Sequence, residues 1–220
     1  MVSSYRNLTT HLLNSTTQLK TMPKRIPNDA YYTPLLIYKW LQDKLQLTNQ
    51  RIFDPCCGNS HATALTFGRD NSIIENDVFE FSSKQRYCFD ATEGWNQHLE
   101  SQDFYSLTEW SGIDWVITNP PYKRGMSEAI IQQSLSYANT GVAMLLRLSW
   151  LEPTRNRVKL LTNSSPRMTL LAVYPVSPRP KFDPNQNGND SVTVAWFIWG
   201  DDYNYDICMK PFDFCVGWQK

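Results

Sequence analysis

Residues 114–122 read DWVITNPPY, a pattern that indicates a buried strand ending in a rigid corner. The segment 115–118 is aromatic and mostly β-branched, which is the composition of a strand inside a sheet. Asn119, Pro120 and Pro121 then end the strand. Each proline fixes its own φ at about −65° and has no backbone N–H, so two in succession stiffen the loop and remove its donors. The stretch therefore predicts a strand followed by a rigid loop whose two prolines have no backbone donors and leave backbone carbonyls as acceptors.

The acceptors of this corner suit an amino group. The side-chain oxygen of Asn119 and the carbonyl of Pro120 are two neighbouring acceptors, and an –NH₂ group has two donors. Tyr122 adds an aromatic face on which a planar substrate can stack. The alternative is a proline-stiffened turn with a buried tyrosine. We favour a site for an amine on a planar ring.

Strands and helices are expected to alternate around this corner. The expected strands are 51–53, 73–74, 115–118 and 142–146, and the expected helices are 34–47, 61–67, 127–137 and 153–161. We expect Thr33 to cap the first helix with Pro34 at its first position, and Ser127 to cap the third. This alternation predicts an α/β fold with a doubly wound, mostly parallel sheet. Two further strands, 168–174 and 192–199, have no helix between them and predict an antiparallel edge hairpin.

Ligands of a doubly wound sheet bind beyond the carboxyl ends of its strands, and two more strand ends are unusual. The first carries Asp54, which could bind a cationic amino group, and Gly58, whose missing side chain lets a ligand approach the backbone. The second carries Asp77, which could accept hydrogen bonds from a ribose. An ordinary strand–turn–helix corner and an exposed loop acid are the respective alternatives.

The charges are balanced in total but separated along the chain. Lys+Arg and Asp+Glu are both 21, so the net charge gives no indication of nucleic-acid binding. Residues 71–114 contain nine acidic and two basic side chains, whereas residues 147–181 contain seven basic and one acidic. The separated charges either mark a binding surface or are solvated faces of the protein.

The composition favours a reduced, cytoplasmic, soluble enzyme. The five cysteines are odd in number and include no CxxC pair, which argues against a disulfide framework or a zinc knuckle. The longest apolar run, residues 194–199, is too short to span a bilayer, and the first twenty residues lack the apolar core of a signal peptide. We expect a polar arm over residues 1–22 and one domain over residues 23–220.

Several motifs together resemble those of the small adenine-specific DNA amino-methyltransferases of phages and bacteria. Residues 119–122 resemble their (D/N/S)PP(Y/F) signature, and residues 54–59 resemble their glycine motif for S-adenosylmethionine. Residues 31–34 resemble the segment that caps the cofactor, and residues 101–104 resemble their DF element. The order of the motifs is the γ arrangement of this family, and the resemblance covers roughly residues 27–200.

This resemblance implies a Rossmann-like class I methyltransferase fold with a seven-stranded sheet, and methyl transfer from S-adenosylmethionine to N6 of adenine. It implies catalytic roles for Asn119, Pro120, Pro121 and Tyr122. The residues implied to contact the cofactor are Tyr31, Thr33, Pro34, Asp54, Pro55, Cys56, Gly58, Asp77, Asp103, Phe104 and Asn119. The chemistry requires no metal, and Cys56 and Cys57 are expected to be packing residues.

If the target lies in duplex DNA, its base must leave the stack, and cations must hold the backbone. The expected substrate contacts are Lys123, Arg124, Arg179 and Lys181. Further candidates for phosphate contact are Arg147, Arg155 and Arg157, which could equally be solvated surface charges. The family usually has a target-recognition domain after the catalytic motif, whereas only about twenty residues follow the last expected strand here. We therefore expect loops, a protein partner or a second copy of the chain to supply recognition.

Three alternatives to DNA methylation stay open at this point. RNA adenine is one, and the glutamine amide of a protein is another, because an amide –NH₂ presents the same two donors. The glutamine enzymes usually carry an N-terminal helical domain, for which the chain has little room, so nucleic acid is favoured. The third alternative is a non-catalytic binding subunit that keeps the fold.

Overall fold

The structure is a computed structural model that describes residues 33–77, 97–98, 111–123, 125–162, 168–182, 192–201 and 215–216. Its helices are α1 (Leu35–Leu45), α2 (Ala62–Phe67), α3 (Met126–Tyr137) and α4 (Arg155–Thr162), with short 3-10 turns η2 (Gly58–Ser60) and η5 (Leu148–Leu151). Its strands are β1 (Arg51–Asp54), β2 (Ser72–Glu75), β3 (Gln97–His98), β4 (Trp115–Thr118), β5 (Gly141–Arg147), β6 (Thr169–Pro175) and β7 (Val194–Gly200).

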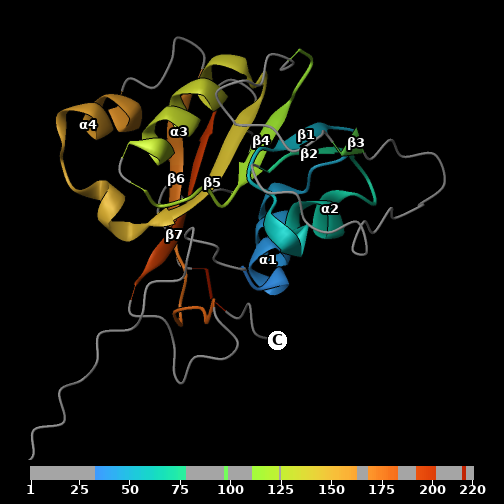
Figure 1. The fold of residues 1–220 in the computed structure, drawn as a ribbon, viewed down its shortest axis with the longest axis horizontal. Coiled ribbons are helices and arrows are strands. Elements are labelled where there is room, and N and C mark those ends of the chain that lie inside the picture. Colours follow the sequence, from blue (N-terminus) through green and yellow to red (C-terminus); the bar gives the residue numbers. More distant parts are fainter. Residues whose placement is uncertain are drawn as a thin grey trace, which may run out of the picture.

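The strands form one seven-stranded sheet in the order β3-β2-β1-β4-β5-β7-β6 (Figure 1). The first five strands of this order run parallel, and β7 runs antiparallel to both β5 and β6. The expected α/β fold, its mostly parallel sheet and its antiparallel edge hairpin are therefore confirmed. The strand order reverses between β1 and β4, which is the point where doubly wound sheets bind their ligands.

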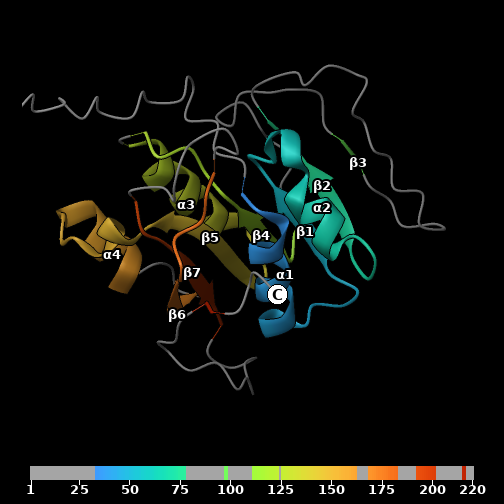
Figure 2. The ribbon, with the colours of Figure 1, turned by 90° about the horizontal axis from the view of Figure 1, so that it is seen from below.

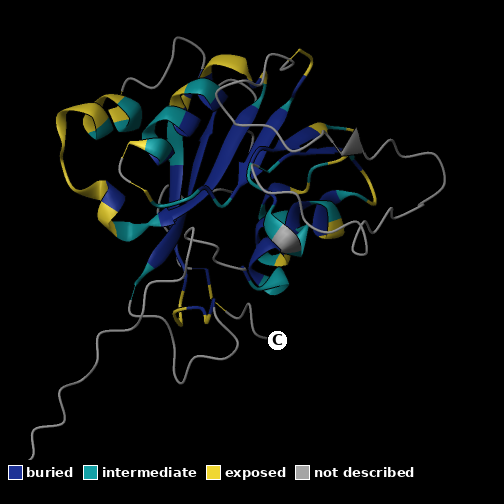
Figure 3. Cartoon of the chain, in the orientation of Figure 1, coloured by how far each residue is buried: buried dark blue, intermediate teal, exposed yellow. Residues whose placement is uncertain are grey.

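Helices cover both faces of the sheet, as Figures 1 and 2 show. Residues of α1 and α2 pack with one face of the strands in one buried cluster, and residues of α3 pack with the other face in a second cluster. The sheet between them is dark blue in Figure 3, whereas α4 is largely exposed. Within the described ranges, every helix is too short or too polar to cross a membrane.

Alternating side chains along each strand build the two clusters. Ile52 and Ile73 face α1 and α2, whereas their neighbours Phe53 and Ile74 face α3. The register between β4 and β5 sets Trp115 opposite Gly141, and a Cβ at Gly141 would lie 2.4 Å from the indole ring. Because this distance is a steric clash, the absence of a side chain at Gly141 lets the two strands pack over the tryptophan.

Both expected helix caps are wrong by one or two residues. Pro34 is the cap of α1, and the helix begins at Leu35 instead of Pro34. Gly125 is the cap of α3, and its N–H donates to the carboxylate of Glu128. Ser127 lies inside the helix because its hydroxyl donates to the carbonyl of Pro121 at 3.0 Å. At α3, the contact of Ser127 with the preceding loop replaces the expected cap, whereas at α1 the hydroxyl of Thr33 accepts from the side-chain amide of Asn119.

Candidate active site

The unusual strand ends identified in the sequence lie along one edge of the sheet. β1, β2, β4 and β5 are parallel, so their carboxyl ends emerge together, and the pairing of β7 with β5 and β6 brings the end of β6 to the same edge. This carboxyl edge carries Asp54 and Arg147, the last residues of β1 and β5, together with Asp77 and Asn119, which follow β2 and β4. The structure thus brings together the three strand ends that the sequence singles out.

Asn119 is held in one orientation by two hydrogen bonds. Its amide nitrogen donates to the hydroxyl of Thr33 at 2.8 Å, although the residues lie 86 positions apart. Its amide oxygen accepts from the hydroxyl of Tyr122 at 2.9 Å. Because Thr33 takes the amide hydrogen, the Asn119 oxygen is left as the acceptor that faces Tyr122.

Two contacts from β5 hold Tyr122 beside the Asn119 oxygen. Its hydroxyl also reaches the carbonyl of Leu145 at 3.4 Å, and the guanidinium of Arg147 lies 5.1 Å from its ring centre. The loop that contains Pro121 is linked to α3 by a hydrogen bond, in which the hydroxyl of Ser127 donates to the carbonyl of Pro121. The tyrosine hydroxyl therefore occupies the place at Asn119 where the sequence predicts a substrate amine.

The glycine turn after β1 is linked to the residues that follow β2 by several hydrogen bonds. The N–H of Gly58 donates to the carboxylate of Asp77 at 2.9 Å, and that of Cys57 to the carbonyl of Asn76 at 3.0 Å. The N–H of Asn76 in turn donates to the carbonyl of Asp54 at 2.9 Å. Gly58 has φ +57°, and a Cβ there would meet no atom within 4 Å. The turn thus has the left-handed backbone that glycine favours and open space in front of it.

Asp54 supports this turn from inside the protein. Its side chain is 1 % exposed, and its two oxygens accept from the N–H of Cys56 and the hydroxyl of Thr63. Burial raises the pKa of this carboxyl to about 7, and the hydrogen bond from Thr63 partly opposes the shift. Both oxygens thus accept hydrogen bonds from within the chain, and the contact of Asp54 with a cofactor stays a prediction.

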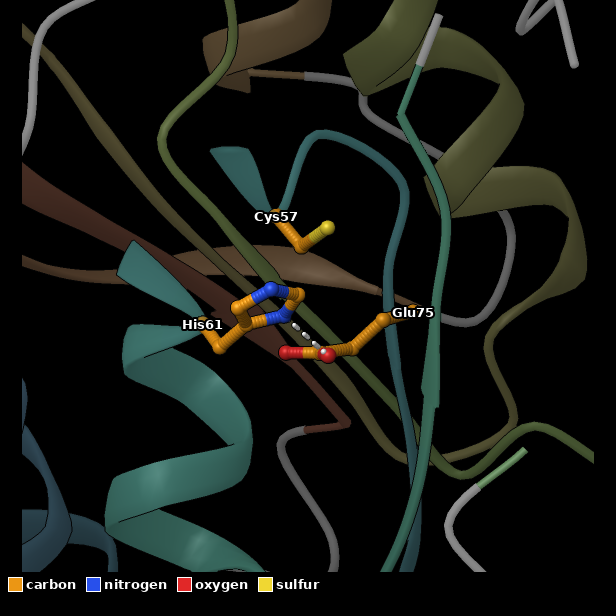
Figure 4. A group of neighbouring side chains, drawn as sticks. All are labelled: Cys57, His61 and Glu75. Carbon is orange, nitrogen blue, oxygen red and sulfur yellow. Dashed lines mark hydrogen bonds and ion pairs between the residues drawn. The ribbon is translucent and has the colours of Figure 1, made fainter. Parts of the chain in front are cut away.

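Beside the turn, His61 and Glu75 form an ion pair at 2.7 Å, and the thiol of Cys57 lies next to them (Figure 4). The three groups offer ligand atoms that all lie within 4.8 Å of one another. The bond to Glu75 raises the pKa of His61 and favours the charged imidazolium, whereas burial raises the pKa of the Cys57 thiol. Protonated groups are poor metal ligands, so the arrangement favours an ion pair that braces the start of α2.

The three predicted cationic contacts that the structure describes lie toward the other end of the carboxyl edge. Lys123 follows Tyr122 and is exposed, and Arg179 and Lys181 are exposed shortly after the end of β6. The carboxyl edge is therefore polarised, with carboxylates beyond β1 and β2 and cations beyond β4, β5 and β6. Of the separated charges of the sequence, Asp77, Arg147, Arg179 and Lys181 lie along this edge, whereas most acidic residues of the range 71–114 lie outside the described residues.

Solved structures of methyltransferases share this architecture. The chain resembles a protein described as a class I S-adenosylmethionine-dependent methyltransferase from Listeria monocytogenes, with TM-score 0.59, 15% identity, and coverage of 89% of this chain and 69% of that chain. It resembles the modification subunit of a protein described as a type I restriction enzyme from Vibrio vulnificus, with TM-score 0.57, 13% identity, and coverage of 83% and 45% respectively. A protein described as an RNA methyltransferase from Pyrococcus horikoshii gives TM-score 0.58, 13% identity, and coverage of 78% and 87%.

The fold is that of the class I methyltransferases. Identities of this size establish the architecture only, and the chain spans less than half of the length of the Vibrio subunit. No protein-family model and no curated protein matches the sequence. The predicted Rossmann-like methyltransferase fold is therefore confirmed by architecture.

Four of the predicted site residues of this methyltransferase fold lie outside the described residues: Tyr31, Asp103, Phe104 and Arg124. Among the described residues, Pro55 and Cys56 form the turn after β1, and Pro34 caps α1. Sequence reasoning missed the bond from Asn119 to Thr33, the contact of Arg147 with Tyr122, and the ion pair of His61 with Glu75. The position of Arg147, at the end of a buried apolar strand, was a signal that could have indicated its contact with the site.

Proposed function

We propose that this protein is an S-adenosylmethionine-dependent methyltransferase that methylates N6 of adenine in DNA. One observation carries the proposal: Thr33 fixes the Asn119 amide so that its oxygen is an acceptor beside Tyr122, at the switch point of a methyltransferase fold. An oriented acceptor next to an aromatic ring suits an amine on a planar base.

Asn119 and Pro120 would act on the nitrogen of the substrate. An aromatic amine is a weak nucleophile because its lone pair is delocalised into the ring. Accepting both amine hydrogens at the Asn119 oxygen and the Pro120 carbonyl localises that pair on nitrogen and stabilises the positive charge that develops there. The hydroxyl of Tyr122 must first leave the Asn119 oxygen, after which its ring is available for stacking.

The glycine turn fits the cofactor. Open space faces Gly58, and Asp77 is partly exposed beside it at the end of β2, where a carboxylate suits the hydroxyls of a ribose. S-adenosylmethionine bound there would supply an electrophilic methyl group. The bond from Gly58 to Asp77 would hold turn and carboxylate together, and the residues that brace them, Asp54 and His61, would keep the turn rigid.

Two observations favour a nucleic acid as the substrate. The cations beyond β4, β5 and β6 lie on the same edge as Asn119, where they could contact phosphates. One structural neighbour is described as the modification subunit of a type I restriction enzyme. By analogy, we propose that DNA is the substrate and that a protein partner or a second copy of the chain contributes to target recognition.

Transfer of tritium from labelled S-adenosylmethionine into DNA, RNA and protein tests the proposal. We expect label in DNA, recovered as N6-methyladenine after hydrolysis. Label in RNA only, or in glutamine of a protein, would replace DNA as the substrate. Failure to bind the cofactor at millimolar concentration would identify a non-catalytic subunit instead.

The variant Asn119→Ala tests the acceptor directly. We expect it to lose about 100-fold or more in kcat, while cofactor affinity and thermal stability stay close to those of the wild type. Asn139→Ala, at an exposed position in the loop between α3 and β5, is the matched control and should retain activity. Full activity of Asn119→Ala would overturn the catalytic assignment.

A further inference from the structure

Arg147, the last residue of β5, is a cation whose guanidinium lies over the ring of Tyr122. Its Nε is buried and has no hydrogen-bond acceptor in the part of the chain that the structure describes. Among the described residues, no carboxylate forms an ion pair with it. The side chain is only partly exposed, so water cannot fully replace the missing partner.

Arg157 shows how this chain satisfies a stacked guanidinium elsewhere. It lies 4.9 Å from the ring centre of Trp150, much as Arg147 lies over Tyr122. Its Nε donates to the carboxylate of Glu128 at 3.1 Å, and a second nitrogen donates to the carbonyl of Ser149 at 3.1 Å. Arg147 has the same stacking contact without these acceptors.

A buried N–H donor of a charged group that has no acceptor raises the free energy of the folded protein. A ligand that supplies the acceptor removes this penalty when it binds. The planar guanidinium presents paired N–H donors that match the oxygens of phosphate or carboxylate. The unmet donor of Arg147 therefore indicates an oxyanion as its ligand.

The position of Arg147 indicates which part of the substrate would carry this oxyanion. Tyr122 lies between Arg147, over its ring, and Asn119, at its hydroxyl. In the sheet, β4 separates β5 from β1, so Arg147 and the glycine turn lie on opposite sides of Asn119. A molecule that presents its amine to Asn119 and its ring to Tyr122 has its remaining groups near Arg147.

We propose that Arg147 binds a phosphate of the nucleotide that carries the target amine. This rests on the proposed methyl transfer and narrows its substrate to a nucleic acid. A glutamine side chain in a peptide presents no such phosphate, so Arg147 would select against it. Arg147 acts as a specificity-determining residue of the site.

Binding of a labelled single-stranded DNA oligonucleotide with one adenine, followed by fluorescence anisotropy across a salt series, tests Arg147. We expect Arg147→Gln to weaken binding about tenfold at low salt and to reduce the slope of log affinity against log salt by about 0.7, the contribution of one phosphate in single strands. Arg147→Lys keeps the charge and should keep the slope. Arg69→Gln, the same change at an exposed site between α2 and β2 at the opposite edge, should match the wild type.

Oligonucleotides with one neutral methylphosphonate locate the phosphate. We expect one position beside the adenine at which this change weakens binding to the wild type about tenfold and has little further effect on Arg147→Gln. The series on the wild type needs no variant, so a wild type without such a sensitive position would overturn the proposal even if the glutamine variant folds poorly. Equal effects of every methylphosphonate on both proteins would overturn the proposal.

Two further measurements separate this proposal from the proposed function. Calorimetry with S-adenosylmethionine should give the same affinity for the wild type and Arg147→Gln, and a selective loss in the variant would assign the oxyanion to the cofactor carboxylate and overturn the proposal. Tritium transfer by the wild type into a glutamine peptide, with no oligonucleotide binding, would refute DNA as substrate and Arg147 as a phosphate ligand together. Transfer into DNA with an unchanged salt slope in the variant would refute the role of Arg147 alone.

Discussion

Asn119 and Thr33 share a hydrogen bond of 2.8 Å that joins the end of β4 to the residue before the cap of α1. Thr33 is 6 % exposed, so little water competes for its hydroxyl. The bond determines which end of the Asn119 amide faces Tyr122. The acceptor on which the proposed chemistry depends is thus oriented by a residue outside the corner itself.

The variant Thr33→Val should lower kcat about tenfold, because the amide of Asn119 loses the acceptor that orients it. Thr33→Ser keeps the hydroxyl and should restore most of the activity. If Thr33 acts through Asn119, the affinity for S-adenosylmethionine measured by calorimetry should change less than twofold in Thr33→Val. A large loss of cofactor affinity with unchanged kcat would assign Thr33 to the cofactor, as the family resemblance implies.

The corner at Asn119 was predictable from the sequence because its determinants are adjacent along the chain. An apolar strand and two prolines fix the backbone locally, and β4 has the expected bounds, Trp115–Thr118. The partners of the corner were not predictable, since Thr33 and Arg147 reach it only through the strand order. The predicted cap of α3 was wrong for a related reason, since the hydroxyl of Ser127 donates to the carbonyl of Pro121.

Asp54 shows the same limit of sequence reasoning. A carboxylate at the end of the first strand indicates a ligand contact, and its position at the carboxyl edge was predicted. Its burial depends on Thr63, which follows in α2, and on the packing of the turn against β2. Local sequence cannot distinguish an acid that faces a ligand from one that supports the turn behind it.

Tyr122 is expected to have two separable roles. Tyr122→Phe removes the hydroxyl that occupies the Asn119 oxygen while keeping the ring, so we expect kcat to be retained and KM for the nucleic acid to stay equal or fall. Tyr122→Ala removes the stacking surface and should raise KM about tenfold or more. Tyr137→Ala, an exposed aromatic on α3, is the control for loss of a tyrosine. A loss of kcat in Tyr122→Phe equal to that in Tyr122→Ala would mean that the hydroxyl itself takes part in transfer.

Asp77 links the glycine turn to β2, so its removal should affect the cofactor first. Asp77→Ala should weaken binding of S-adenosylmethionine about tenfold, because Gly58 loses its acceptor and the ribose loses a carboxylate. Asp77→Asn keeps an oxygen for Gly58 and should separate the two effects, with an intermediate affinity in calorimetry. Asp70→Ala, at an exposed position before β2, serves as control. Unchanged affinity in Asp77→Ala would remove Asp77 from the cofactor site.

Burial of Asp54 predicts that stability falls as pH rises. Its pKa is raised from 3.8 to about 7 in the folded protein, so between these values the folded state holds a proton that the unfolded state has released. The unfolded state then binds fewer protons, and the free energy of unfolding decreases with pH across about pH 4 to 7, by up to about 4 kcal/mol. Above pH 7, both states are ionised at this group and its contribution stays constant.

The variant Asp54→Asn isolates this effect, because the amide oxygen can accept from Cys56 without ionising. Urea unfolding at pH 5 and pH 8 should show that the wild type loses stability with pH relative to Asp54→Asn, with the variant the more stable of the two at pH 8. The pKa of His61 is also raised, so its contribution to the free energy of unfolding falls as pH rises. This change occurs in both proteins and largely cancels in the comparison. Asp43→Asn, the same change at an exposed site on α1, should leave the pH dependence of the wild type unchanged. A wild type whose stability relative to Asp54→Asn is constant or rises between pH 5 and pH 8 would show that Asp54 is ionised in the fold and that its burial is compensated by the hydrogen bonds of the turn.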